Sequence, residues 1–456
     1  MNPPFTRPTG HEAGKIGVPV PSFAGFDTSR DEQLAMSRKL RAQPKLFGHG
    51  NAGLASEFMD LAHDKLKSGG VLALVLPFSF VSGQAWSNAR DSLSRWYRDI
   101  HVVSIATAGT TARSFSADTG MAECLVLATR AKSARSRSAV PPVRYANLDR
   151  RPRTLLEAHE SAKRIRAGSS IKGNFRDSGA AGIQDPDLSD VLTALRAGRL
   201  DFPRLARARR VPITTMEHLA ERGLYHMDIN GAGGRGAFEI QDGLGRGVPT
   251  YPVLWSHDAE RERGLVVKPD SRGVVRPGMR SQAKDTWAAT ASRLHHNVDF
   301  QINSQSLAAC LTEHPCIGGR AWPNLLPRSK RYEVPLLLWS NTTLGLMAYW
   351  WCGVRQQMGR ASVKITAVPD LPTLDARALS KKQLRQLDHV LVDFDGSAFL
   401  PANEAYRDDV RKELDARVLG VLGLSGRVLD SLDLVRSKWC SEPSVHGGKH
   451  TRPDAA

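Results

Sequence analysis

Residues 54–83 read LASEFMDLAHDKLKSGGVLALVLPFSFVSG, and this stretch decides the fold class of the chain. Its first part has apolar residues at helical spacing, namely Leu54, Phe58, Leu61, Ala62 and Leu66. That spacing predicts an amphipathic helix over residues 51–66 with one buried face. Residues 67–70 end the helix, because glycine takes the left-handed conformation at low steric cost. The unbroken apolar run 71–77 is typical of a strand covered on both faces, as in a parallel sheet.

The same alternation continues toward residue 130. Residues 86–97 predict a second amphipathic helix, and residues 100–106 and 121–129 predict two more short strands. A helix, a Gly-Gly turn, a strand, a helix and two strands form the second half of a doubly wound α/β domain. No segment of this chain has the pattern of the first half. We therefore predict an α/β fold, with the C-terminal half of a Rossmann-like sheet over residues 1–132.

The rest of the chain divides into three expected segments: a mixed α+β region over residues 133–378, C-terminal helices over 379–442 and a disordered tail over 443–456. Residues 130–153 are rich in Arg, Ser and Pro and are expected to form an exposed edge or linker. Residues 155–220 are expected to be largely helical and basic. Short β-like runs between glycines predict irregular mixed structure from there to residue 330.

Residues 334–354 are apolar enough to require comparison with a membrane span. They carry no charge, but Ser340, Asn341, Thr342 and Thr343 lie near their middle. These polar side chains would be costly in lipid, so we expect a buried strand-and-helix segment and no membrane partner. Prolines and charges occupy the place of the apolar part of a signal peptide, so the chain is expected to be cytoplasmic.

The charge balance favours a polyanionic partner. The 63 Lys and Arg residues exceed the 46 Asp and Glu residues, which gives a net charge of +17. Each neutralised phosphate releases counterions, so double-stranded DNA is the expected partner, although a basic surface that only confers solubility is the alternative. The arginines expected to follow the phosphate backbone are Arg204, Arg207, Arg209 and Arg210.

The five cysteines predict neither a disulfide framework nor a metal centre. Their number is odd, and no two of them are spaced Cys-x-x-Cys. Cys310, His314 and Cys316 lie close together, but a zinc site would normally need a fourth ligand and a second short pair. We expect isolated, partly buried thiols and no metal.

The tetrapeptide Asn2-Pro3-Pro4-Phe5 carries the strongest chemical signal. An exocyclic adenine amine is a poor nucleophile, because its lone pair is delocalised into the ring. An Asn side-chain oxygen and the next carbonyl can accept both amine hydrogens and free that lone pair. The prolines stiffen the turn, and the aromatic ring can stack on a base that has left the duplex. A chance match in a proline-rich segment is the alternative, but the order of elements that follows favours the chemical interpretation.

With this motif and its context, the chain resembles class I, γ-type N6-adenine DNA methyltransferases of restriction–modification systems. The matching pieces are NPPFTR at residues 2–7, the stretch 54–83, FSADTGMAECLVLATR at 115–130 and a stretch at 338–372 that ends in a Gly-Arg pair and Leu-Pro. The resemblance implies that residues 133–378 include the target-recognition region.

The resemblance also implies a set of site residues. Asn2 and Pro3 would bind the amine, Pro4 would fix the turn and Phe5 would stack on the base. The strand end would line the substrate pocket with Pro77, Phe78 and Ser79. The Gly-Arg pair implies a DNA contact by Arg360.

The methyl donor of this family is S-adenosyl-L-methionine, and its site departs from the family pattern here. The family has an acidic or aromatic–Gly-x-Gly loop before the tetrapeptide, whereas only Met1 precedes Asn2. Residues 230–236 are glycine-rich but have no strand-to-helix context, so a plain glycine loop is expected. The cofactor-binding residues therefore stay unknown. An internal Met taken as the start, a truncated gene, or a partner polypeptide that supplies the cofactor lobe would each explain this pattern.

Two functions follow as hypotheses. The first is a DNA adenine-N6 methyltransferase, or its catalytic and target-recognition fragment. The second is a non-catalytic DNA-binding fragment or subunit that needs a partner chain for the cofactor lobe. An RNA or protein methyltransferase is a third interpretation, and the long basic C-terminal region favours DNA over it.

Overall fold

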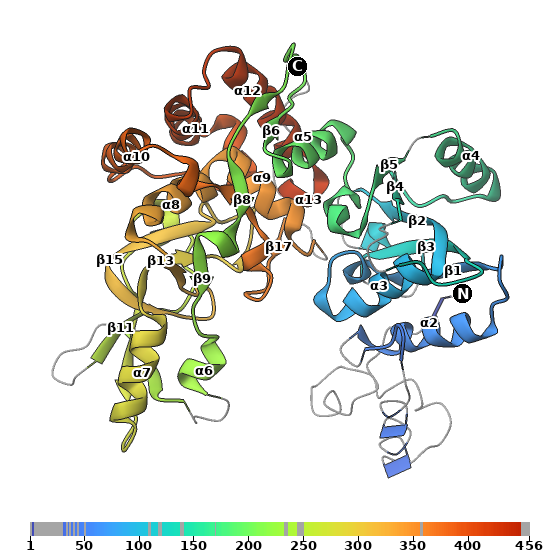
Figure 1. Ribbon diagram of the computed structural model, residues 1–456, viewed down its shortest axis with the longest axis horizontal. Helices are drawn as coiled ribbons and strands as arrows, with labels where there is room; N and C mark the ends of the chain where they lie inside the picture. The colour runs from blue at the N-terminus through green and yellow to red at the C-terminus, as the bar shows by residue number, and fades with distance from the viewer. Residues whose placement is uncertain are drawn as a thin grey trace. The chain divides into compact units, whose positions relative to one another are not determined.

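The structure of the chain is a computed structural model that describes residues 2–3, 31–32, 35, 38–39, 42, 45–49, 52–107, 111–116, 121–136, 141–168, 170–231, 236–243, 250–355 and 359–447. The chain forms two compact units (Figure 1). Unit 1 comprises Met1–Pro186 with Val354–Met358, and unit 2 comprises Asp187–Gly353 with Gly359–Ala456.

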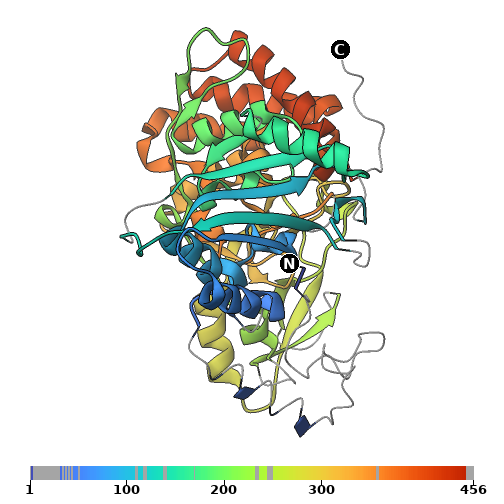
Figure 2. The same cartoon turned by 90° about the vertical axis from the view of Figure 1, so that its right-hand side faces the viewer.

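Unit 1 is built on a five-stranded sheet with the order β1-β3-β2-β4-β5 (Figure 2). Its strands are β1 (Val71–Pro77), β2 (Tyr97–Ile105), β3 (Glu123–Arg130), β4 (Val143–Leu148) and β5 (Ile171–Gly173). Strand β3 pairs antiparallel with both β1 and β2, and β2 pairs parallel with β4. Strands β1, β2 and β4 therefore run in one direction and β3 runs against them, so the sheet is mixed.

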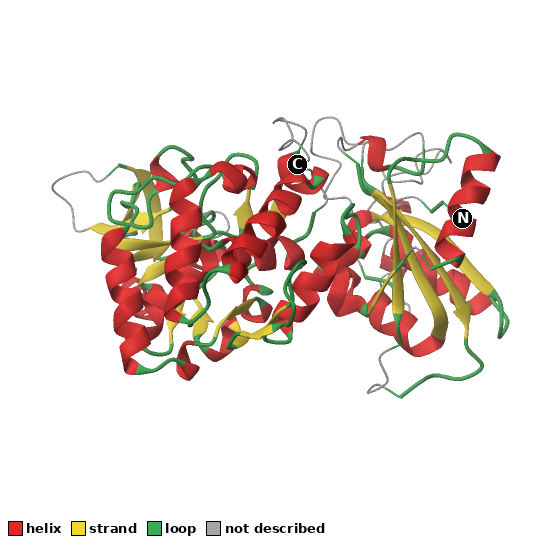
Figure 3. Cartoon of the chain, turned by 90° about the horizontal axis from the view of Figure 1, so that it is seen from above, coloured by secondary structure: helices red, strands yellow, loops and turns green. Residues whose placement is uncertain are grey.

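Among the elements whose bounds the structure describes, three longer helices accompany this sheet (Figure 3), and they are α2 (Leu54–Lys65), α3 (Ser87–Trp96) and α4 (Leu155–Arg166). The sequence pattern predicted the first two helices and the three strands β1, β2 and β3 to within a few residues. Gly69 has a φ of 81° and makes the left-handed turn between α2 and β1, as the Gly-Gly pair predicted. The parallel strands β1 and β2 are joined through α3, as a crossover connection requires.

Two predictions for unit 1 are wrong. In β1, exposed and buried residues alternate from Val71 to Leu74, and Val71 is 61% exposed, so the described residues cover only one face there. An unbroken apolar run does not reveal this, because each of its residues is apolar whichever way it points. Residues 143–148 are a sheet strand rather than a linker, because Val143 and Tyr145 point into the core.

Unit 2 contains a second five-stranded sheet with the order β10-β12-β11-β15-β13. Its strands are β10 (Phe238–Asp242), β11 (Thr250–Leu254), β12 (Ser271–Val275), β13 (Ser292–His296) and β15 (Ala309–Gly318). Four two-stranded pairs accompany it, made of β6 (Arg199–Leu200) with β7 (Arg209–Arg210), β8 (Ile213–Thr215) with β18 (Pro372–Leu374), β9 (Ala220–Arg222) with β16 (Leu325–Pro327), and β14 (Asp299–Phe300) with β17 (Ala361–Ser362). This arrangement agrees with the mixed α+β structure that was predicted.

The helices of unit 2 are α5 (Pro186–Arg196), α6 (His226–Asn230), α7 (Arg280–Thr290), α8 (Glu333–Asn341), α9 (Thr343–Cys352), α10 (Lys381–Asp393), α11 (Asp409–Val421), α12 (Arg427–Ser441) and α13 (Pro443–His446). A buried ion pair joins two of them, because Arg436 Nη2 of α12 lies 2.8 Å from Asp415 Oδ2 of α11. Asp415 also accepts hydrogen bonds from the backbone N–H and the hydroxyl of Thr343, at the start of α9.

Three predictions for this part of the chain are corrected. Residues 199–215, expected to be helical, contain β6, β7 and β8 instead, and Pro203 and Pro212 within this stretch oppose a helix. Residues 334–354 are two buried helices, α8 and α9, rather than a strand and a helix. Residues 443–446, assigned to a disordered tail, form α13, whose Val445 is buried. Residues 448–456 lie outside the described residues.

The boundary between the units differs from the expected one at residues 132/133. It falls at Pro186/Asp187, because β4 and β5 extend the sheet of unit 1. Within the described residues, no helix is both long and apolar enough to cross a membrane.

Candidate functional site

The end of β1 carries the residues predicted to line a substrate pocket. Pro77 is the last residue of β1 and lies opposite Glu123 in the register with β3. Phe78 begins a short 3-10 helix and donates its backbone N–H to the carbonyl of Ala122 at 2.8 Å. Pro77 and Phe78 are buried and Ser79 is half-buried. Ser79 is therefore the member of this trio with accessible surface.

The ring of Phe78 is packed against a buried guanidinium. The Cζ atom of Arg113 lies 4.6 Å from the ring centroid, and burial lowers the pKa of Arg113 to about 10. Arg113 Nη1 donates to the carbonyl of Arg355 at 3.1 Å. The backbone of Gly182 also packs closely against this ring, because a Cβ atom at this position would lie 3.0 Å from Phe78 Cζ. This packing fixes the ring of Phe78 in place.

Glu123 holds the loop beside this strand end, and the sequence analysis did not select it. Its carboxylate accepts hydrogen bonds from the backbone N–H groups of Phe115, at 2.7 Å, and Ser116, at 2.8 Å, and from the Ser116 hydroxyl. Glu123 is 1% exposed. The available signal was a single acid at the start of an otherwise apolar strand, since an acid there must find partners when it is buried.

The predicted amine-binding residues belong to unit 1. Asn2 is exposed and Pro3 is buried. The N-terminal end of the chain lies close to β1 and α2 (Figures 1 and 2). The other two members of the tetrapeptide, Pro4 and Phe5, lie outside the described residues.

The four arginines predicted to contact DNA lie on and around the two-stranded pair β6–β7 of unit 2. Arg204, Arg207, Arg209 and Arg210 are all exposed. Arg204 has a φ of 70°, a left-handed conformation that is uncommon for residues other than glycine. Together with Arg199 these residues form what we call the arginine ribbon.

Arg199 is the member of the arginine ribbon that sequence reasoning missed. It lies on β6 directly opposite Arg210 of β7, and it is exposed. Like charges in opposite positions of an antiparallel pair destabilise it. Among the described residues, no ion pair with a carboxylate involves any arginine of the ribbon, so its charge faces solvent. Only strand pairing brings Arg199 beside Arg210, which explains why sequence spacing did not reveal it.

Arg360, the other predicted DNA contact, already has a carboxylate partner. Its Nε donates to Asp299 Oδ1 at 2.7 Å, and its Nη2 also bonds this carboxylate. Burial opposes ionisation of Asp299, but hydrogen bonds from Arg360 and Ser362 outweigh it and hold the pKa of Asp299 below its ordinary value. Arg360 could reach a phosphate only by exchanging one anionic partner for another.

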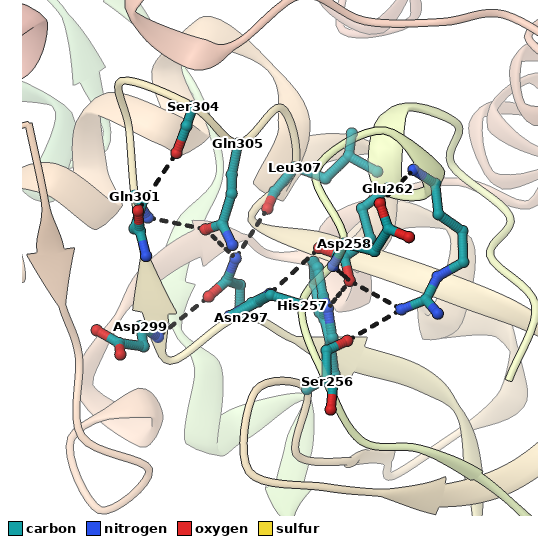
Figure 4. Close-up of polar contacts among 12 residues, drawn as sticks. Ser256, His257, Asp258, Glu262, Asn297, Asp299, Gln301, Ser304, Gln305 and Leu307 are labelled. Atoms are coloured by element: carbon teal, nitrogen blue, oxygen red, sulfur yellow. Dashed lines mark hydrogen bonds and ion pairs between the residues drawn. The ribbon is translucent and has the colours of Figure 1, made fainter. Parts of the chain in front are cut away.

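A cluster of polar residues near this pair is joined by hydrogen bonds within the protein (Figure 4), although the buried His257 Nε2 and Arg261 Nε atoms have no hydrogen-bond partner among the described residues. Glu262 accepts hydrogen bonds from Trp322 Nε1, at 2.8 Å, and from the backbone N–H of Asp258, at 3.0 Å. Asn297 donates to Gln305 Oε1 at 3.1 Å. These bonds fix the loops that carry the residues, and they explain why buried polar side chains occur here.

The cysteines are more deeply buried than expected. Burial raises the pKa of the Cys124 and Cys310 thiols, and it raises the pKa of Cys316 and Cys440 to about 12. Cys352 is only partly buried. All five are free thiols, as predicted. No cluster of three or more His, Cys, Asp or Glu side chains in the described part of the chain could hold a metal ion.

The glycine-rich residues 230–236 do not have the geometry of a nucleotide-binding loop. Gly231 follows helix α6, and the backbone N–H of Gly236 donates to the carbonyl of Asn230 at 3.0 Å, shortly before β10 begins. The segment therefore runs from a helix to a strand, whereas a phosphate-binding loop runs from a strand to a helix. Residues 232–235 lie outside the described residues.

Comparisons with known proteins give weak structural similarity alone. No family model matches the chain, and no curated protein matches it. The chain is similar to the type IIG restriction endonuclease BpuSI at 11% identity, over 95% of this chain and 52% of that one, with a TM-score of 0.34. It is also similar to the ATP-dependent type ISP restriction-modification enzyme LlaBIII bound to DNA, at 10% identity over 72% and 23% of the two chains, with a TM-score of 0.32.

A third similar structure is the HsdS subunit from Thermoanaerobacter tengcongensis, at 11% identity over 64% of this chain and 56% of that chain, with a TM-score of 0.23. The structural neighbours are thus restriction-modification proteins. The chain spans about half the length of the type IIG enzyme and about a quarter of the type ISP enzyme. Similarity of this extent assigns neither an activity nor a substrate.

Proposed function

We propose that the chain is part of a DNA adenine-N6 methyltransferase, and that Asn2 and Pro3 bind the amine of an adenine turned out of the duplex. The observation that supports this proposal is that Asn2 and Pro3 belong to unit 1. Pro3 is buried, and the N-terminal end lies close to β1, the strand that ends at Pro77, Phe78 and Ser79 (Figure 1). Asn2, Pro3 and the strand end that the resemblance assigns to the same site therefore belong to one compact unit.

In this proposal the chain supplies binding and orientation. The side-chain oxygen of Asn2 accepts one amine hydrogen, and the carbonyl of Pro3 accepts the other. Both bonds favour a tetrahedral nitrogen whose lone pair points away from the ring, and Phe5 stacks on the base. Holding the amine in this geometry lowers the entropic part of the barrier. The extruded base implies that DNA is bound with one nucleotide flipped.

The methyl donor in this proposal is S-adenosyl-L-methionine, which supplies an electrophilic methyl group when bound. The described residues do not fit its site, because the described ends of the glycine-rich segment 230–236, at Gly231 and Gly236, follow helix α6 and precede strand β10. We assign no described residue to the cofactor and no reaction step to it. In this scheme S-adenosyl-L-methionine is bound by residues outside those that the structure describes, or by a partner polypeptide.

The DNA contact in this proposal is made by the arginine ribbon. Its exposed guanidinium groups suit phosphates, which bind arginine in a bidentate geometry. The net charge of +17 supports the same partner. Arg360 would contact a DNA phosphate after breaking its bonds to the Asp299 carboxylate. A protein that acts on DNA in this way would work in the cytoplasm.

A second candidate function is a DNA-binding subunit without catalysis of its own. This function is favoured because no cofactor-binding loop is found among the described residues. In this case a partner polypeptide would supply the cofactor lobe, and the chain would contribute the grip on DNA.

The test is methylation by the Asn2→Ala variant. The chain is produced in cells that lack adenine methylation, and N6-methyladenine is measured by mass spectrometry of the hydrolysed DNA. We expect methylation by the unchanged chain, none by Asn2→Ala, and full methylation by Asn88→Ala, which alters an exposed asparagine of α3. Duplex binding should be equal in all three. Salt-sensitive DNA binding without any methylation would favour the second function, and methylation by Asn2→Ala would exclude the proposed chemistry.

A further inference from the structure

A cavity of about 850 Å³ lies between helix α4 and one face of the sheet of unit 1. Its floor is made by cross-strand neighbours of β2 and β3, in which Val103 lies opposite Leu125 and His101 opposite Leu127. Burial, and then the charge of Arg144, lowers the pKa of His101. The floor is therefore an uncharged, largely apolar surface at neutral pH.

Helix α4 covers this floor incompletely. Of its residues only Ser161 is buried, while Leu155 is 91% and Leu156 is 72% exposed. A second hollow, of about 570 Å³, shares Ser161 with the first. A 12-residue helix is marginal in water unless it buries an apolar face. Leu156 lines the second hollow, and Leu155 precedes it at the start of α4, so two exposed leucines lie beside the cavity.

The rim of the cavity is basic. Arg151, Arg153 and Arg166 line it. Among the described residues none of these three forms an ion pair with a carboxylate. The acids of α4 are already engaged, since Glu157 pairs with Arg150 and Glu160 pairs with Lys163. The rim therefore offers positive charge to whatever fills the apolar floor.

We propose that this cavity and the leucines beside it form a groove that receives an amphipathic helix of a second polypeptide. Apolar side chains of that helix would lie on Val103, Leu125 and Leu127, and acidic side chains on its flanks would pair with the arginine rim. The proposal concerns unit 1 alone and does not depend on the proposed enzyme activity.

The shape of the groove selects a helix among the possible occupants. Its floor is a side-chain face rather than a strand edge, so an added strand would find no backbone partners there. A helix satisfies its own backbone hydrogen bonds and presents side chains alone. A small amphipathic anion could fill the cavity, but it would leave Leu155 and Leu156 in water. A helix long enough to lie along the groove would cover them as well.

The experiment measures binding of two synthetic 18-residue peptides to the full chain by fluorescence anisotropy. One peptide has leucine along one helical face and glutamate on its flanks, and the other has lysine in place of glutamate. We expect saturable binding of the glutamate peptide and none of the lysine peptide. The double variant Leu155→Ser/Leu156→Ser should weaken binding about tenfold or more, because two leucines lose their contact with the peptide. Both leucines are exposed, so the fold should tolerate the change.

A charge-matched pair of variants separates docking from general attraction to a basic protein. Arg151→Ala/Arg153→Ala removes two charges from the rim, whereas Arg199→Ala/Arg210→Ala removes two from the arginine ribbon. The first should weaken binding and the second should leave it unchanged. Equal loss in both, equal binding of the two peptides, or unchanged binding by the leucine variant would overturn the proposal. Displacement of the peptide by dodecanoate, with dodecanoate binding insensitive to the leucine variant, would overturn it in favour of a small amphipathic anion.

Discussion

Arg199 and Arg210 lie directly opposite each other on β6 and β7, so the strand pairing itself holds two like charges together. This repulsion destabilises the free protein, and a phosphate between the two guanidinium groups would relieve it. Selection for stability alone would not favour such a pair. Its cost to the fold and its gain in binding can be measured separately.

The first prediction concerns this pair. Arg210→Thr should raise the free energy of unfolding by roughly 0.2–1 kcal/mol, because the cross-strand repulsion disappears. The same change should weaken duplex binding. The plot of the logarithm of the DNA association constant against the logarithm of the salt concentration should become shallower, with a slope smaller in magnitude by about 1. Urea unfolding and a salt titration of DNA affinity give the two values. Arg385→Thr on α10 changes an exposed arginine elsewhere and should alter neither as much.

The second prediction concerns Asp299, which occupies the guanidinium of Arg360. Asp299→Asn should tighten duplex binding at low salt, because Arg360 becomes available and a negative charge is lost. Adding Arg360→Ala should reverse the gain. The control is Asp393→Asn, which breaks the exposed ion pair with Arg417. An equal gain in duplex affinity from Asp299→Asn and Asp393→Asn would show that the gain comes from the change in net charge and not from the release of Arg360.

The third prediction concerns the buried pair of Asp415 and Arg436. Asp415→Ala should lower the free energy of unfolding by about 3–5 kcal/mol, because the buried Arg436 loses its buried carboxylate partner. The Thr343 N–H at the start of α9 loses an acceptor as well. Adding Arg436→Met should recover much of the loss, since it removes the uncompensated charge. Urea denaturation followed by tryptophan fluorescence measures both, and a double variant less stable than Asp415→Ala would contradict this account.

The fourth prediction concerns pH. Burial lowers the pKa of both His295 and His296 to about 4, from an ordinary value of 6.5. Between these pH values the unfolded chain binds more protons than the folded chain, so the free energy of unfolding should fall as the pH is lowered from 6.5 toward 4. The expected loss is up to about 3 kcal/mol for each histidine. Above pH 6.5 this contribution is fully present.

The pH effect can be assigned to one residue by variants. His295→Gln should reduce the number of protons taken up on unfolding near pH 5 by about one. The matched control is His389→Gln, at an exposed position of α10. Calorimetric proton-uptake measurements in two buffers give the values. Equal proton uptake by the unchanged chain and the His295 variant would show that His295 is not kept neutral by the fold.

The sequence predicted local elements well where one periodicity dominates. The stretch 54–83 specified α2, the turn at Gly69 and β1, because a helical stripe, a glycine and an apolar run each have one common structural solution. It did not show that Val71 and Ala73 of β1 are exposed among the described residues, since burial depends on which segments lie against a strand. It also did not place residues 143–148 in the sheet, because arginines and prolines in the surrounding sequence masked the alternation of Val143 and Tyr145.

The candidate site was predictable only in part, for the same reason. Pro77, Phe78 and Ser79 were selected because the family resemblance assigns this strand end, which is visible in sequence, to the substrate pocket. Glu123 and Arg199 could not be selected, because their importance arises from partners that are brought to them by β-sheet pairing. The arrangement of Arg360 with Asp299 joins residues far apart in the chain, and no local pattern records it.

The burial of the thiols has a practical consequence. Four of the five cysteines are buried, with pKa values raised by burial, whereas Cys352 at the end of α9 is only partly buried. A thiol-selective reagent applied to the native chain should therefore modify Cys352 first. A fluorophore or spin probe can thus be attached at one defined position of unit 2 without removing any other cysteine, which equips the unaltered protein for distance measurements in solution.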